Sequence, residues 1–191
     1  MIRNILFALF LAVIGHYSGF SQVKNSEFQK LFDLYTMENY EKCAYKAESY
    51  SRKDKYRREP EPYLYMALCF YQAHVHPEKF DTEYPDALKD ALKYAYKFRK
   101  KDKSGELYQS NKELLDKIRE EAISQAKFYY NDGDYRKSAS EFNRILKVMP
   151  DDVNIIFITG VAMIESKNLG EGTKYVSQAL DSLKTYKQEG R

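Results

Sequence analysis

The sequence predicts an all-α fold made of repeated antiparallel helix pairs, and three observations support that prediction. Apolar or small residues recur at one fixed interval between positions 119 and 180. The matching pairs are Ala126 and Gly160, Tyr129 and Met163, Tyr135 and Leu169, Phe142 and Val176, and Ile145 and Ala179. Each copy has an apolar stretch, a short polar turn and an amphipathic stretch. The apolar residues keep the three- and four-residue spacing of helices.

The two copies read EEAISQAKFYYNDGDYRKSASEFNRILKVMP (120–150) and VNIIFITGVAMIESKNLGEGTKYVSQALDSL (153–183). A helix-turn-helix unit of about 34 residues resembles the tetratricopeptide repeat (TPR) family. The resemblance implies about four units with eight helices, stacked as a short right-handed superhelical solenoid in which each pair packs on its neighbours. It also implies a non-enzymatic scaffold, and it does not name the partner.

Residues 1–21 have the features of a secretory signal peptide. Arg3 supplies the positive charge, residues 5–14 are an unbroken apolar run, and the small residues Gly19 and Ser21 precede Gln22. That run is too short to cross a bilayer as a helix, which takes roughly 20 residues. A retained membrane anchor is the alternative. Residues 22–191 are then one helical repeat domain of an exported, periplasmic protein, free or associated with the outer membrane.

The first unit begins with apolar residues at helical spacing, from Phe28 to Tyr35, followed by a turn at residues 37–39. Its second helix, from Tyr40 to Tyr50, matches the helix that begins at Tyr135 at a constant offset. The same offset places Glu27 and Lys30 on core positions. We therefore expect the register of the first helix to be shifted by about one residue relative to the other units.

The second unit starts at Pro60 and Pro62, and residues 63–71 are apolar all round, as expected of a helix packed on both sides. Residues 74–84 form an insertion, about eight residues beyond the usual turn, and the partner helix begins at Pro85. Residues 110–113 (SNKE) have the form of a capping box. They introduce a helix of about 20 residues that runs to Tyr130.

The two cysteines, Cys43 and Cys69, are expected at the same level of adjacent antiparallel helices. In an oxidising compartment they have the placement needed for a disulfide. The alternative is two buried free thiols.

No catalytic constellation is present: the sequence has no CxxC pair, glycine-rich phosphate loop or nucleophile elbow. The only cluster with metal-ligand chemistry is His74 and His76 with Glu78 and Asp81, and its spacing matches no established zinc site. We therefore expect no catalytic residue, no cofactor and no metal. The alternative is a metal-dependent enzyme or regulator built on this segment.

In TPR proteins the first helix of each pair lines a concave groove, and the resemblance places partner-binding residues there. Those of the last two units are Ile123, Lys127, Tyr130, Phe157, Val161 and Ile164. Those of the first two units are Phe28, Phe32, Tyr35, Leu64, Leu68 and Tyr71. Such an apolar surface suits an amphipathic helix or apolar peptide of another envelope protein, as in accessory subunits of secretion, motility or outer-membrane assembly and uptake complexes. The alternative is that these residues belong to the core.

Two other surfaces are candidates. The basic runs 52–58 and 97–103 are expected at one edge of the array, where they either offset helix dipoles or attract anionic lipid, peptidoglycan or an acidic partner. Membrane contact is then at most peripheral. The net charge of +3 does not indicate nucleic acid. The last helix is expected either to cover itself with its polar residues Ser177, Asp181, Lys184 and Gln188 or to associate with a second copy.

Overall fold

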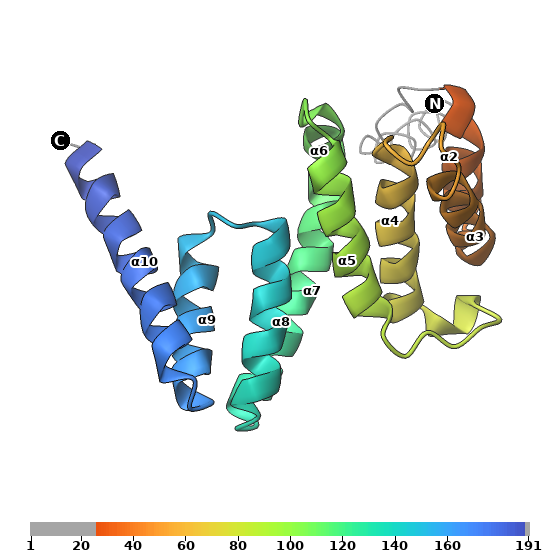
Figure 1. Cartoon of the computed structure of the whole chain (residues 1–191). Coiled ribbons are helices and arrows are strands. Elements are labelled where there is room, and N and C mark those ends of the chain that lie inside the picture. The colour runs from red at the N-terminus through yellow and green to blue at the C-terminus, as the bar shows by residue number, and fades with distance from the viewer. Residues whose placement is uncertain (1–25, 190–191) are drawn as a thin grey trace, which may run out of the picture.

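The computed structural model describes the backbone of residues 26–189 and the side chains of residues 27–184. This part of the chain is entirely helical, without strands (Figure 1). Its elements are η2 (Ser26–Phe28), α2 (Gln29–Thr36), α3 (Tyr40–Ser51), α4 (Glu61–Val75), η3 (Pro77–Lys79), α5 (Ala87–Lys101), α6 (Glu106–Ser110), α7 (Lys112–Asn131), α8 (Tyr135–Val148), α9 (Val153–Glu165) and α10 (Leu169–Glu189). The predicted signal peptide and the side chain of Gln188 lie outside the described residues.

The helices pack in four successive pairs: α2 with α3, α4 with α5, α7 with α8, and α9 with α10. Consecutive pairs are joined by contacts of α3 with α4, α5 with α7 and α8, and α8 with α9. The predicted all-α fold class is therefore confirmed. The short helix α6 raises the number of α-helices in the described residues from the expected eight to nine.

Three of the four pairs close with the same turn. Glu38, Gly133 and Lys167 all have positive φ, at 58°, 81° and 70°. The amide of the next residue then donates to a carbonyl five residues back: Asn39 to Leu34, Asp134 to Tyr129 and Asn168 to Met163, each at 2.9 Å. This is the hydrogen bonding of a Schellman helix end. The three turns occupy equivalent positions of the repeat expected from the sequence, so the structure repeats as the sequence does.

From Leu31 onward the first unit keeps the register of the others, so the expected one-residue shift is confined to the start of its first helix, where Phe28 and not Glu27 is buried. Leu31, the equivalent of Ala126 in the first unit, is fully buried, as Ala126 is. The α-helix α2 is short, and the 3-10 turn η2 before it brings Phe28 into the core, while Glu27 stays exposed.

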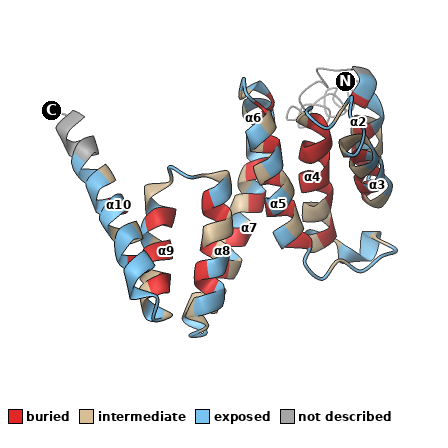
Figure 2. Cartoon of the chain, in the orientation of Figure 1, coloured by how far each residue is buried: buried red, intermediate tan, exposed pale blue. Residues whose placement is uncertain are grey.

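Helix α4 is the most buried helix of the molecule (Figure 2), and its buried side chains run without a break from Glu61 to Cys69. It packs against α2, α3 and α5 and touches α7, so no stripe of it remains for solvent over that stretch. The apolar character that the sequence shows all round this helix is thus explained by neighbours on each side.

The insertion between α4 and α5 spans residues 76–86, because α4 continues to Val75 and α5 begins at Ala87 rather than Pro85. Contacts with the first unit attach it to the array. Lys79 Nζ lies 2.5 Å from a carboxylate oxygen of Glu38. Glu41 accepts hydrogen bonds from the Asp81 amide at 3.0 Å and from the Tyr84 hydroxyl at 3.2 Å.

These contacts predict that Glu41 titrates below the ordinary glutamate value of 4.5. Hydrogen bonding from the Thr82 side chain, helped by the Asp81 amide and the Tyr84 hydroxyl, lowers the pKa of Glu41 against a smaller opposing effect of burial. Because the folded pKa is the lower one, the loop contacts stabilise the fold fully above pH 4.5 and are lost as the pH falls through the folded value. NMR titration of the carboxyl carbon measures the midpoint.

Thr82→Val is expected to move that midpoint back toward 4.5. Thr36→Val is the control, because the Thr36 hydroxyl bonds the Phe32 carbonyl and leaves Glu41 alone. A wild-type midpoint at or above 4.5 would contradict the attachment of the loop through Glu41.

The junction between the second and third units differs from the prediction of a capping box at residues 110–113. Ser110 is the last residue of α6, and its hydroxyl donates to the Glu106 carbonyl at 2.8 Å. Asn111 precedes α7 without a capping side-chain hydrogen bond and donates instead to the Leu107 carbonyl. The predicted length of the following helix is confirmed, since α7 has 20 residues.

Candidate partner-binding surfaces

The six groove positions of the last two units lie on α7 and α9, and none of them is fully buried. Phe157 is 43% exposed and Lys127 is exposed, while Ile123, Tyr130, Val161 and Ile164 are half-buried. We call these six residues the apolar strip. The carboxy-terminal ends of α7 and α9 are close together. Burial raises the pKa of Tyr130, and the negative charge of the Glu165 carboxylate raises it further.

The groove positions of the first two units are mostly part of the core, which corrects the prediction for them. Leu64 and Leu68 are buried, as are Phe28 and Tyr35, and only Phe32 and Tyr71 remain half-buried. Helix α4 contacts α2 and α7 as well as α3 and α5, and Leu64 and Leu68 belong to the hydrophobic core of the molecule. The accessible positions of the predicted groove are therefore the six of the third and fourth units, with Phe32 and Tyr71 as the remaining ones of the first two units.

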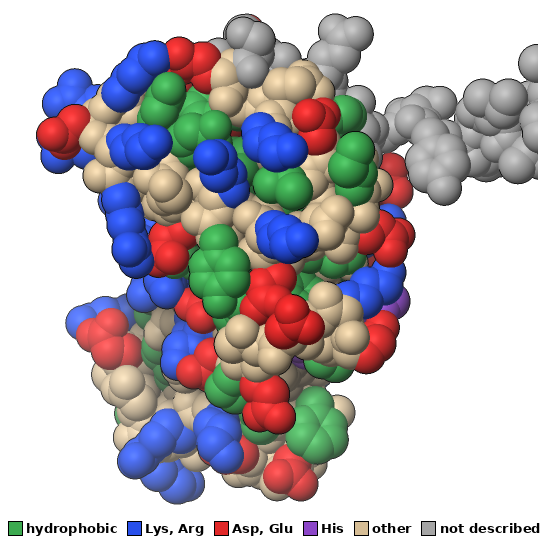
Figure 3. Space-filling model, turned by 90° about the vertical axis from the view of Figure 1, so that its right-hand side faces the viewer, with side chains coloured by type: hydrophobic (Ala, Val, Ile, Leu, Met, Phe, Trp, Pro, Cys, Tyr) green, Lys and Arg blue, Asp and Glu red, His purple; other side chains and the backbone are tan. Residues whose placement is uncertain are grey.

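The two basic runs meet as expected at one edge of the array. Lys101 Nζ donates to the Arg57 carbonyl at 2.6 Å and lies 4.7 Å from the centre of the Tyr63 ring. Burial, together with nearby Lys97, Arg57 and Arg58, lowers the pKa of Lys101. We call residues 52–58 and 97–103 the basic rim. Figure 3 shows Lys and Arg side chains gathered over the upper part of the face that it presents.

The histidine cluster is not gathered into a metal site. His74 lies in α4 rather than in the insertion, and its Nε2 is 3.3 Å from a Glu121 carboxylate oxygen of α7. His76 pairs instead with Glu78 at 3.4 Å. Within the described residues, no group of three or more His, Cys, Asp or Glu is placed to hold a metal ion. His74 thus serves as a contact between two units, whereas His76 and Glu78 pair with each other at the end of α4 and in the insertion.

Cys43 and Cys69 lie on α3 and α4, as predicted, and both are buried with free thiols. The Cys43 sulfur is 3.4 Å from the Leu31 carbonyl oxygen. Burial, followed by the hydrogen bond with Cys43, raises the pKa of Cys69. The two sulfurs are therefore neighbours, and a disulfide between them in an oxidising compartment stays a prediction.

The last pair leaves apolar side chains exposed at the carboxy-terminal end. In the part of α10 whose side chains are described, Ser177, Asp181 and Lys184 are exposed, but so are Leu169, Leu180 and Leu183. Figure 2 shows most of this helix as accessible. Polar residues thus cover only part of the last helix, and both expected alternatives remain open at this end.

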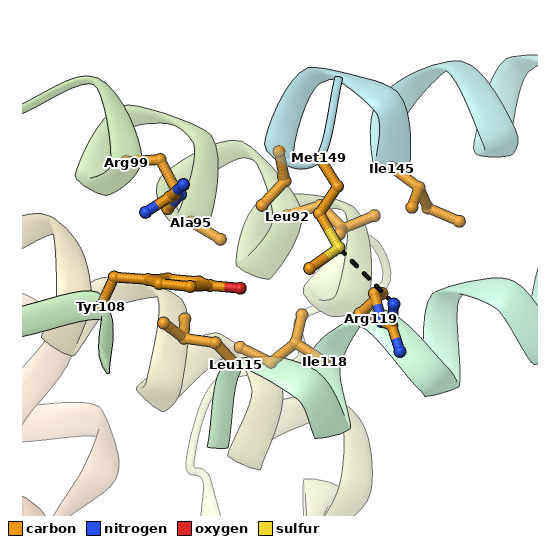
Figure 4. A pocket seen from close by; sticks show the side chains of 10 residues that line it. Leu92, Ala95, Arg99, Tyr108, Leu115, Ile118, Arg119, Ile145 and Met149 are labelled. Carbon is orange, nitrogen blue, oxygen red and sulfur yellow. Dashed lines mark hydrogen bonds between the residues drawn. The ribbon is translucent and has the colours of Figure 1, made fainter. Parts of the chain in front are cut away.

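A narrow apolar crevice lies where α5, α6, α7 and α8 meet (Figure 4). Its walls include Leu92, Leu115 and Ile145, and the Arg99 guanidinium stacks on the Tyr108 ring at 3.8 Å. Its free volume is about 10 Å³, barely enough for one water molecule. The crevice is therefore a packing seam between the second and third units and not a ligand pocket.

Sequence analysis missed a wider cleft on the outer side of this seam, between α5 and α8. Its volume is about 250 Å³, and it is lined by Lys89, Leu92, Lys93, Tyr96, Arg144 and Lys147. The sequence did contain a signal for this cleft. Lys89 and Lys93 are four residues apart on α5, and Arg144 and Lys147 are three apart on α8, so each pair lies on one helix face.

Comparison with protein-family models finds no match for this chain, and a search of curated proteins finds none either.

Proposed function

We propose that this protein is a TPR-like, non-enzymatic scaffold of the cell envelope that binds another protein through the apolar strip or the carboxy-terminal end. Four successive helix pairs and three turns with the same hydrogen bonding, of which those at Gly133 and Lys167 are one repeat apart, support the TPR-like architecture. A right-handed superhelical stacking of the pairs is part of the proposal.

The proposal rests on one observation: groove positions that are equivalent in the repeat are buried to different extents. On α4 the groove positions Leu64 and Leu68 are buried, but on α9 Phe157 is 43% exposed and Val161 is only half-buried. A row of partly accessible apolar side chains along one helix is typical of a docking site. Its size and helical spacing suit the apolar face of an amphipathic helix from the partner.

Export supports an envelope partner and rests on the amino-terminal sequence, which lies outside the described residues. Arg3, the apolar run of residues 5–14 and the small residues before Gln22 are the features of a signal peptide. Within the described residues, no helix combines the length and the apolar character needed to span a membrane. Accessory subunits of secretion, motility or outer-membrane assembly and uptake complexes fit an exported scaffold of this kind.

The test is an affinity pull-down from native envelope extract with the mature wild-type chain and Phe157→Asp/Val161→Asp. Both side chains face solvent at least in part, so the double variant should fold with about the wild-type stability. We expect it to lose the partner, because two carboxylates would have to be desolvated in the interface. Met37→Asp is the control, since Met37 is 70% exposed and lies on the first unit.

Thermal unfolding of all three chains is measured first, so that a variant that fails to fold is not mistaken for one that fails to bind. Partners that are lost with Phe157→Asp/Val161→Asp and kept with Met37→Asp support the strip as the docking surface. Recovery of the same proteins by all three chains would exclude the strip and leave the carboxy-terminal end, where Leu180→Asp is the equivalent variant.

The meeting of the two basic runs favours a second candidate function. With Lys97, Arg57 and Arg58 around Lys101, the rim concentrates positive charge that would attract anionic lipid or peptidoglycan. Such binding would weaken steeply as salt rises, because exposed charges are screened over about 8 Å at physiological ionic strength. Binding through the apolar strip would change little with salt.

A further inference from the structure

The cleft between α5 and α8 brings four cations of two units together. Lys89 and Lys93 line one wall from α5, and Arg144 and Lys147 line the other from α8. Within the described residues, no carboxylate lines the cleft. Its remaining lining consists of Leu92 and Tyr96, which provide an apolar surface between the charged walls.

The two walls are held at a fixed spacing by the packing seam beneath them. Leu92 lines both the cleft and the seam, and Ile145 and Met149 from the end of α8 also line the seam (Figure 4). Leu92 and Ile145 are buried, so neither helix can rotate its charged face away without opening the core. The cations are therefore kept facing one cleft even though like charges repel each other.

The charges of the cleft are only partly compensated. Lys89 is 3.3 Å from Asp86, Lys93 is 2.7 Å from Asp90, and Arg144 pairs with Glu141. Each of these acids lies one helical turn before its partner and outside the lining of the cleft. Lys147 has no ion pair within the described residues. The Lys89 and Lys93 pairs lie at the surface and are weak, so a bound anion can take over these two lysines together with Lys147 at little cost, whereas the Arg144–Glu141 pair is more buried.

We propose that this cleft binds an acidic segment of a partner protein, with carboxylates on the charged walls and an apolar side chain between them on Leu92 and Tyr96. Its volume of about 250 Å³ is smaller than the roughly 300–1,000 Å³ of small-molecule pockets and fits side chains of a peptide. A free inorganic anion would leave the apolar surface uncovered. A flat bilayer surface would not reach the floor between two helices.

The site is independent of the apolar strip. It lies on the second helices of two units, α5 and α8, whereas the strip lies on the first helices α7 and α9. The Phe157→Asp/Val161→Asp variant should therefore bind an acidic peptide as wild type does, so failure of one proposal leaves the other standing.

The test is fluorescence anisotropy with the mature chain and a labelled peptide in which Glu alternates with Leu. We expect Lys93→Gln/Lys147→Gln to weaken binding by about tenfold or more, because two charge-assisted hydrogen bonds are lost. The matched control, Lys53→Gln/Lys103→Gln, removes the same charge from the basic rim and should change the affinity by no more than about twofold. Similar thermal unfolding of both variants shows that each is folded.

Two further probes separate the cleft from general charge attraction. A peptide with Ser in place of Leu should bind the wild-type chain more weakly, and Tyr96→Ala should weaken binding of the Leu peptide. Equal weakening by the cleft and rim variants would overturn the proposal, as would equal affinity for the Leu and Ser peptides. Phosphatidylglycerol vesicles that bind through Lys93 and Lys147 while the peptide does not would also overturn it.

Discussion

Gly172→Ala is expected to lower the free energy of unfolding of the last helix pair by about 3 kcal/mol or more, at the upper end of overpacking costs. A methyl group at Gly172 would lie 2.7 Å from the Gly160 carbonyl oxygen and 2.9 Å from the Ile164 amide nitrogen. Both atoms belong to the backbone of α9, so no side-chain rotation relieves the contact. The two helices would have to separate.

Gly160→Ala should have a similar effect, because the contact is reciprocal. Its methyl group would lie 2.8 Å from the Gly172 carbonyl oxygen and 2.9 Å from the Val176 amide nitrogen. These distances show that Gly172 and Gly160 are the small residues that let the paired helices touch. Gly160 follows Ala126 by one repeat, and both are buried where a first helix meets its partner.

Gly170→Ala is the control on the same helix, because a methyl group there has nothing within 4 Å. It should be neutral or stabilise α10 by up to about 1 kcal/mol through helix propensity. Hydrogen exchange measures the difference, since repeat arrays can open locally. Amides of α9 and α10 should exchange faster in Gly172→Ala while those of α4 stay protected. Equal protection in Gly170→Ala and Gly172→Ala would contradict the close contact.

The repeat was predictable because its signals are local. The turn after α7 needs a positive φ at Gly133, and the same position in the last unit is found one repeat later, at Lys167. The buried positions follow from helical spacing alone, as at Ile118, Ala122 and Ala126 of α7. Local hydrogen bonding and burial of one helix face thus determine most of the architecture.

The junction before α7 was not predictable by the same means. Residues 110–113 match a capping box, but the amide of Tyr108 donates to the Asp102 carboxylate at 2.7 Å, and this contact organises an earlier helix start, that of α6. Gly105, with a φ of 71°, allows the chain to enter α6. A glycine followed by Leu107 and Tyr108 was the only local sign of this extra turn.

Surfaces were the least predictable part, because they depend on which helices become neighbours. The apolar pattern of α4 is the same whether its faces are open or covered by neighbouring helices, so Leu64 was assigned to a groove although it lies in the core. The basic cleft is lined by both Lys93 and Arg144, which are far apart in the sequence. Neither result follows from helical spacing within one segment.

Phe142→Ala is expected to lower the free energy of unfolding by about 3–5 kcal/mol, the usual cost of removing a buried phenylalanine ring. Phe142 is fully buried on α8, the helix that contacts α5, α7 and α9. Loss of its ring leaves a cavity at the point where the third unit is joined to both of its neighbours. Urea denaturation followed by far-UV circular dichroism measures the change.

Phe128→Ala is the matched control, since its ring is 66% exposed on α7 and contacts only the Tyr129 ring among the aromatic residues described. It should change the free energy of unfolding by about 0.5 kcal/mol or less. The counterpart of Phe142 in the last unit, Val176, is only half-buried, so its truncation should cost less than that of Phe142. A loss of about 1 kcal/mol or less in Phe142→Ala would contradict a continuous core through α8. A large loss in Phe142→Ala together with a smaller loss in Val176→Ala would show that burial at equivalent positions of the repeat depends on how many neighbouring helices the unit has.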